Sequence, residues 1–73
     1  MPKLPVAKPK ELLKALLKEG FVVKRKSGSH LHLAHHDGRS TSIAMHSKPI
    51  PPGTLHAILK QTRLTVEKLK KLI

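Results

Sequence analysis

The chain has 73 residues, of which 15 are Lys or Arg and four are Asp or Glu, so its formal net charge is +11. A chain of this length forms one small domain with a limited core. The charge favours an anionic partner, above all nucleic acid, because each phosphate contact releases a counterion. With no Trp or Tyr and one Phe, the chain is unlike proteins that stack single-stranded bases on exposed aromatic rings.

The chain contains no cysteine, which excludes disulfide bridges and thiolate-held zinc and suits a reducing compartment. No segment approaches the roughly 20 apolar residues of a membrane span. The N-terminus is basic, but no apolar run follows it as in a signal peptide. We therefore expect a cytoplasmic protein without a membrane partner.

Residues 1–8 are rich in proline and lysine and are expected to form a flexible arm, so the domain proper is expected over residues 9–73. Pro9 suits a first helical turn, and Gly20 stands where a helix commonly ends. Between them, apolar residues recur at helical spacing. These signals predict a helix over residues 9–19, with a stripe made of Leu12, Leu13, Leu16 and Leu17.

Three strand-like segments follow, over residues 21–26, 30–33 and 41–46. The first two are separated by the turn Ser27–Ser29, and the next turn is marked by the Asp37–Gly38 pair. A meander of three short antiparallel strands is the simplest arrangement of such segments.

Prolines then interrupt the chain, and a second apolar stripe with Leu55, Ile58 and Leu59 predicts another helix. Thr65 is expected to cap a short last helix. The α-β-β-β-α order predicts an α+β fold in which a three-stranded antiparallel sheet carries the helices on one face and leaves the other open. This order resembles that of the double-stranded-RNA-binding domain.

The alternation of apolar residues predicts which side chains face the helices. Pairing Leu31 with Met45 and Leu33 with Ile43 keeps all four on the apolar face. The residues between them must then lie on the open face.

With this register His30 lies opposite His46. A three-residue loop between the first two strands sets Lys26 opposite His30 and Lys24 opposite His32. The sequence therefore predicts a single open face that carries Lys24, Lys26, His30, His32 and His46.

This set of side chains suits the cleavage of RNA by its own 2′-hydroxyl. The reaction needs a base near that hydroxyl, an acid near the leaving 5′-oxygen and cations for the developing charge. Imidazole titrates near neutrality, and neighbouring cations favour its neutral form, which accepts a proton. Lys24 or Lys26 would hold the phosphate.

The remaining histidines, His35, His36 and His56, are expected to be ordinary surface residues. Zinc sites use fixed ligand spacings with help from cysteine or carboxylate, and the histidine cluster matches no such spacing. We therefore expect no metal and no other cofactor.

Four short pieces carry a family resemblance, in order and at fixed spacing over about residues 10–70. They are Lys18–Phe21, Lys26–His30, Met45–His46 and Pro52–Gln61. On these pieces the chain resembles the HicA-type toxins, small messenger-RNA-cleaving enzymes of toxin–antitoxin pairs. The chain departs from them at Thr62–Arg63, where an Ala-Gly pair usually closes the second helix.

The resemblance implies a double-stranded-RNA-binding-like fold, cleavage of mRNA and neutralisation by a HicB-type antitoxin. It implies that His30, by its match to the family's Gly-Ser-His motif, is the catalytic residue. Gly28 and Ser29 match the turn that presents it. The residues expected to contact RNA are Lys24, Lys26, Gly28, Ser29, His32 and His46.

Two other classes of protein remain open at this point. The first is a binding module that holds structured RNA without cutting it, because no second acid or base stands out beside His30. The second is an accessory RNA-processing or DNA-binding protein, although the chain has no helix-turn-helix pattern. Degradation of bulk RNA in EDTA, and growth arrest on expression without a partner, would separate an enzyme from a binding module.

Overall fold

Six elements follow one another in the computed structural model, which describes residues 4–73. They are α1 (Pro9–Glu19), β1 (Val22–Ser27), β2 (His30–Ala34), β3 (Ser40–Ala44), α2 (Pro52–Thr62) and α3 (Val66–Leu72). The expected α+β fold, with its α-β-β-β-α order and short helical tail, is confirmed.

Helix α1 has the predicted bounds because both of its ends are specified by single residues. Pro9 occupies its first turn, where a missing N–H costs nothing. Gly20 ends it with φ 109°, and its N–H is directed at the carbonyls of Leu16 and Leu17. A Cβ at Gly20 would lie 2.9 Å from His35 Nε2, so this position requires glycine for space as well as for its backbone conformation.

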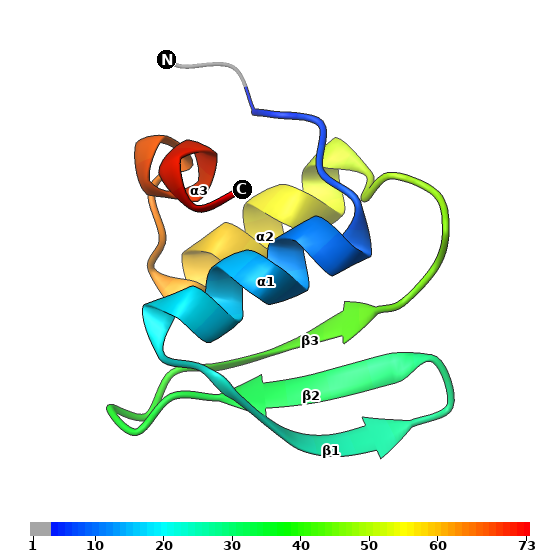
Figure 1. Ribbon diagram of the computed structural model, residues 1–73, viewed down its shortest axis with the longest axis vertical. Helices are drawn as coiled ribbons and strands as arrows, with labels where there is room; N and C mark the ends of the chain where they lie inside the picture. The colour runs from blue at the N-terminus through cyan, green and yellow to red at the C-terminus, as the bar shows by residue number, and fades with distance from the viewer. Residues whose placement is uncertain (1–3) are drawn as a thin grey trace.

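The three strands form an antiparallel meander in the order β1-β2-β3. Helices α1 and α2 lie over one face of this sheet, and α3 lies beyond them on the side away from the sheet (Figure 1). The helices pack on β3, whereas every residue of β1 is exposed. The opposite face of the sheet has no cover among residues 4–73, as predicted.

The core lies between the helices and the sheet. Phe21, which was expected to begin the first strand, precedes β1 and is 1% exposed. Its ring is the largest of the fully buried side chains. The other buried apolar residues come from every element except β1: Leu12, Ala15, Leu16, Leu33, Ile43, Leu55, Ile58, Leu59 and Leu69, with Ala7 and Leu64 outside the elements.

The pairing of β1 with β2 differs from the predicted pairing by one residue. Ser27 pairs with His30, so the turn contains two residues, Gly28 and Ser29, rather than three. Lys26 therefore pairs with Leu31 and not with His30. The prediction was wrong because the composition of a Ser-Gly-Ser segment does not fix the length of its turn.

The pairing of β2 with β3 differs from the predicted pairing by two residues. Leu31 pairs with Ile43 and Leu33 with Thr41, so His30 lies opposite Ala44 rather than opposite His46. A shift of two residues leaves every side chain on its predicted face, because the strand period is two. Alternation alone cannot distinguish these two registers.

Strand β3 also ends earlier than expected, at Ala44 rather than at His46. The N–H of His46 bonds back to the carbonyl of Ala44 at 3.0 Å. This tight bend takes His46 out of the ladder, so its predicted place on the open face beside His30 was wrong.

The two later helices agree with the apolar pattern. Leu55, Ile58 and Leu59 are buried on α2. Thr65 is the N-cap of α3, and its hydroxyl accepts the Lys68 N–H at 3.1 Å. Both predictions are confirmed.

Part of the N-terminal arm is described, and its first three residues lie outside the described range. Ala7 is fully buried, and its carbonyl accepts the N–H of Ile50 at 2.8 Å. The arm therefore packs against the domain at this point, whereas a domain boundary at residue 8 stays a prediction.

Candidate active site and nucleic-acid interface

The turn between β1 and β2 presents His30. Gly28 has φ 61°, and Ser29 does not share this positive φ, as in a type II′ hairpin turn, whose first central residue is usually glycine. The carbonyl of Ser29 accepts the N–H of Met45 at 2.7 Å. This bond fixes the start of β2 against the chain that leaves β3.

The imidazole of His30 is therefore held at the beginning of a strand on the open face. The residue is exposed, and the histidine that makes side-chain hydrogen bonds among residues 4–73 is His35, not His30. An exposed ring without a hydrogen-bond partner among residues 4–73 is free to exchange a proton with a bound substrate.

His32 lies two residues further along β2 and so shares the face of His30. It pairs with Arg25 on one side and with Ser42 on the other. A β-bulge between Val23 and Arg25 sets Lys24 and Arg25 together against His32. The structure thus brings two cations and two imidazoles onto one face.

A broad, shallow depression of about 760 Å³ follows this part of the sheet. Lys24, Arg25 and His32 contribute to its lining. His30 does not line it. On β2 the lining begins at His32, two residues after His30.

Arg25, and not the predicted Lys24, pairs with His32, although Lys24 lines the same depression. Lys26 is not beside His30. Because Lys26 pairs with Leu31, its side chain leaves the sheet on the helix side. Arg25 takes its place on the open face, although the sequence pattern does not single it out. Its position depends on the two-residue turn and on the bulge in β1, and the sequence pattern indicates neither of them.

His46 lies outside the sheet, in the segment between β3 and α2. It is exposed and lines two cavities. One, of about 230 Å³, is mostly apolar and includes Ile43, Ile50 and Ile58 in its wall. The other, of about 220 Å³, is lined by Lys8, Lys10, His46 and Ser47.

His35 is not the ordinary surface residue that the sequence suggested, because its side chain is 9% exposed. Its Nε2 lies 3.2 Å from the carbonyl of Glu19, and its Nδ1 lies 3.2 Å from the N–H of Asp37. Its ring packs edge-on against Phe21, with 5.1 Å between the centroids. His35 thus joins the end of α1 to the turn between β2 and β3, whereas His36 and His56 are exposed as expected.

Asp37 and Arg39 complete this junction. Arg39 Nε donates to Asp37 Oδ2 at 2.8 Å, and its NH1 donates to the carbonyl of Thr62 at 2.6 Å. Partial desolvation raises the pKa of the Asp37 carboxyl, but the hydrogen bond from the Arg39 N–H and the charges of Arg39 and His35 outweigh it. The net effect holds the pKa of Asp37 below its ordinary value of 3.8.

Within residues 4–73 no three His, Asp or Glu side chains converge in a way that could hold a metal ion. In the same range, none of the helices has the length and apolarity to cross a membrane.

The fold and this surface define a class of protein: a small, strongly basic α+β domain with a double-stranded-RNA-binding-like order and an open cationic sheet. Residues 9–64 match the family model of the HicA toxin of bacterial toxin–antitoxin systems. The chain therefore belongs to the HicA toxin family, as its motifs suggested. A comparison with curated proteins finds no match to the chain.

Proposed function

We propose that this HicA-family protein is an endoribonuclease that cleaves mRNA in the cytoplasm with His30 as its catalytic residue, and that a HicB-type antitoxin silences it. One observation carries the proposal. The glycine turn holds an exposed imidazole on an uncovered sheet face, and that face also carries Lys24, Arg25 and His32.

The chemistry follows from these positions. The neutral ring of His30 takes the proton of a ribose 2′-hydroxyl, and that oxygen attacks the adjacent phosphorus atom. The bond from phosphorus to the 5′-oxygen then breaks, and the leaving oxygen takes a proton. The products are a 2′,3′-cyclic phosphate and a free 5′-hydroxyl.

The neighbouring residues have separate roles in this scheme. Lys24 and Arg25 hold the phosphate backbone, since cations contact phosphate oxygens without reading the sequence. His32 shares the face of His30 and supplies a second imidazole on that face, either for phosphate contact or for protonation of the leaving oxygen. Gly28 and Ser29 bring the RNA close to His30, because the turn carries no bulky side chain.

The test is cleavage of an mRNA fragment by purified protein in EDTA, with His30→Ala compared with His56→Ala. His56 is exposed on α2 and lies off the sheet, so its removal takes away an imidazole without touching the groove. We expect His30→Ala to abolish cleavage and growth arrest, and His56→Ala to leave both unchanged. The change at an exposed strand end alters the free energy of unfolding by no more than about 0.5 kcal/mol, which urea unfolding checks.

Three outcomes would contradict the proposal. Full toxicity in a folded His30→Ala protein would remove His30 from the active site. Activity that disappears in EDTA and returns with one metal would replace acid–base catalysis by metal catalysis. RNA binding without cleavage by the wild-type protein would favour a binding module.

A further inference from the structure

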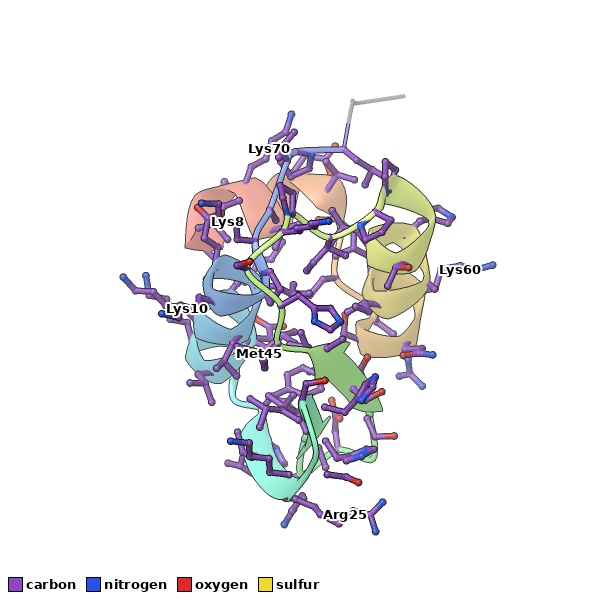
Figure 2. The ribbon with its side chains drawn as sticks, turned by 90° about the vertical axis from the view of Figure 1, so that its right-hand side faces the viewer. Lys8, Lys10, Arg25, Met45, Lys60 and Lys70 are labelled. Atoms are coloured by element: carbon purple, nitrogen blue, oxygen red, sulfur yellow. The ribbon has the colours of Figure 1, made fainter. Side chains whose placement is uncertain are left out.

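A separate, smaller cleft lies beside the segment that leaves β3, and a backbone hydrogen bond joins this segment to the turn before His30. It has a volume of about 220 Å³ and is lined by Lys8, Lys10, His46 and Ser47. The two lysines come from the start of α1, and the other two residues come from the segment after β3. Figure 2 looks onto this region, with Lys8, Lys10 and Met45 in it and Lys60 pointing away.

The polar groups of this cleft all suit an anion. They are two ammonium groups, an imidazole and a hydroxyl, and no carboxylate lines the cleft. The nearest acid along the chain is Glu11, whose Oε1 accepts the backbone N–H of Lys8 at 2.9 Å. That carboxylate is committed to the end of the helix. Neither lysine forms an ion pair among residues 4–73.

The positions of the two lysines oppose the local electrostatics of the fold. Lys8 is the N-cap of α1, and Lys10 lies in its first turn. The positive end of the helix macrodipole favours acidic residues there and disfavours cations. Since the helix itself gains nothing from these two charges, an external anion is the natural explanation for them.

The backbone connects this cleft to the candidate active site. The hydrogen bond between Ser29 and Met45 joins the two segments, and His30 and His46 are the next residues after its two partners. His30 also pairs with Ala44, which is two residues before His46. An extended strand of RNA can therefore pass from His30 to the cleft around the end of β3, without crossing the helices.

We propose that this cleft binds a backbone phosphate of the RNA strand whose scissile bond lies at His30. The inference rests on the proposed function and adds a contact beyond the sheet. Lys8 and Lys10 neutralise the phosphate as point charges, and Ser47 and His46 bond its oxygens. Lys8 comes directly before the residues that match the family. This chain would therefore extend its RNA-binding surface with part of its own N-terminal arm.

The experiment compares two double variants with the same loss of charge, both in a His30→Ala background that keeps the RNA intact. Lys8→Gln with Lys10→Gln removes the cations of the cleft. Lys14→Gln with Lys60→Gln removes two exposed helix cations that line neither the cleft nor the depression beside His32. Removing cations from the first turn of α1 relieves the macrodipole, so the cleft variant should fold, and circular dichroism checks this.

The measured quantity is the affinity for a labelled single-stranded RNA of about a dozen nucleotides at several salt concentrations. For the cleft variant, we expect the slope of log Kobs against log salt to fall by about 0.7, the value for one phosphate on a single strand. The control variant should keep the slope of the His30→Ala parent. The backbone amide of Ser47 should shift on RNA addition in the parent and not in the cleft variant.

Equal slopes in the two double variants would overturn the proposed phosphate site, because the loss of slope would then reflect net charge alone. An unchanged RNA affinity together with lost binding of an acidic protein partner would also overturn it, by assigning the cleft to a carboxylate. Neither result affects the proposed function, which fails separately if the wild-type protein does not cleave RNA.

Discussion

The histidines of this chain differ in what their rings are free to do. The ring of His30 is exposed at the start of β2, while that of His35 is fixed by the carbonyl of Glu19 and the N–H of Asp37. A ring whose two nitrogens are both engaged in the fold is poorly suited to take a proton from a substrate. The spacing of the histidines does not reveal this difference. It arises because the turn between β2 and β3 brings His35 against the end of α1.

Asp37, which lies at the same junction, makes the free energy of unfolding depend on pH. Its pKa in the folded protein lies below 3.8, whereas an unfolded aspartate titrates at about 3.9. A carboxyl with a depressed pKa stabilises the folded state above its unfolded pKa, and this contribution is lost as the pH falls through the folded pKa.

Replacing Asp37 with Asn should therefore lower the free energy of unfolding at pH 7 and flatten its decline below about pH 4. Urea unfolding of both proteins between pH 7 and pH 2 gives the comparison. The wild type and the variant should differ most at neutral pH and converge in acid. A constant difference across this range would mean that the Asp37 carboxylate adds nothing to the junction beyond its shape.

At the scale of the elements, the sequence predicted what single residues specify and missed what depends on pairing. Pro9 and Gly20 mark the ends of α1, and Thr65 marks the start of α3. The register of the sheet has no such marker, because alternation fixes it only to within two residues. His30 and His32 were therefore assigned to the correct face, and Lys26 was not, since the turn has two residues rather than three.

Helix α2 ends at a residue, Arg63, whose backbone conformation is unfavourable for a non-glycine residue. Arg63 has φ 58° and ψ 28°, and it is the non-glycine residue with positive φ among residues 4–73. The left-handed conformation costs an L-residue about 1–2 kcal/mol. Glycine is the usual residue at this position of a helix, so the chain keeps the geometry of the helix end without the residue that suits it.

Replacing Arg63 with Gly should raise the free energy of unfolding by about 0.5–1 kcal/mol, because relief of strain exceeds the greater entropy that glycine loses on folding. The urea midpoint should rise with an unchanged m-value. The matched control is Arg63→Ala, which removes the guanidinium but keeps the Cβ and should bring no such gain. Equal stability of the Gly and Ala variants would show that Arg63 is not strained.

At the scale of the molecule, the acids and the cations are unevenly distributed. Two of the four acids, Glu19 and Asp37, are engaged by Arg39 at the junction with the β2–β3 turn. Glu11 caps α1. The fourth acid, Glu67, lies in α3. Among residues 4–73 no cation of the β1–β2 hairpin forms an ion pair. A net charge of +11 makes this hairpin attractive to RNA and to an acidic protein alike.

A toxin of this family has an antitoxin partner, and we expect that partner to cover the open sheet face with an acidic surface. A standard interface buries about 800 Å² on each protein, roughly a sixth of the 4929 Å² accessible surface of this chain. That area is enough to cover the open sheet face from Arg25 to His30. The helices leave β1 free, so a partner reaches this face without unfolding any element.

Charge reversal on that face provides the test. Arg25→Glu should lower the association rate with the antitoxin several-fold and weaken its salt dependence, because charges at an interface steer encounter. Lys14→Glu changes the net charge equally, but it lies on the outer side of α1 and should have a smaller effect. Amide shifts mapped in the complex should concentrate on β1 and β2. Shifts confined to the helices, with His30 left open to RNA, would instead require an allosteric route through a core of about a dozen side chains. Protein interiors are close-packed, so a core of this size offers little room for a second arrangement of its side chains.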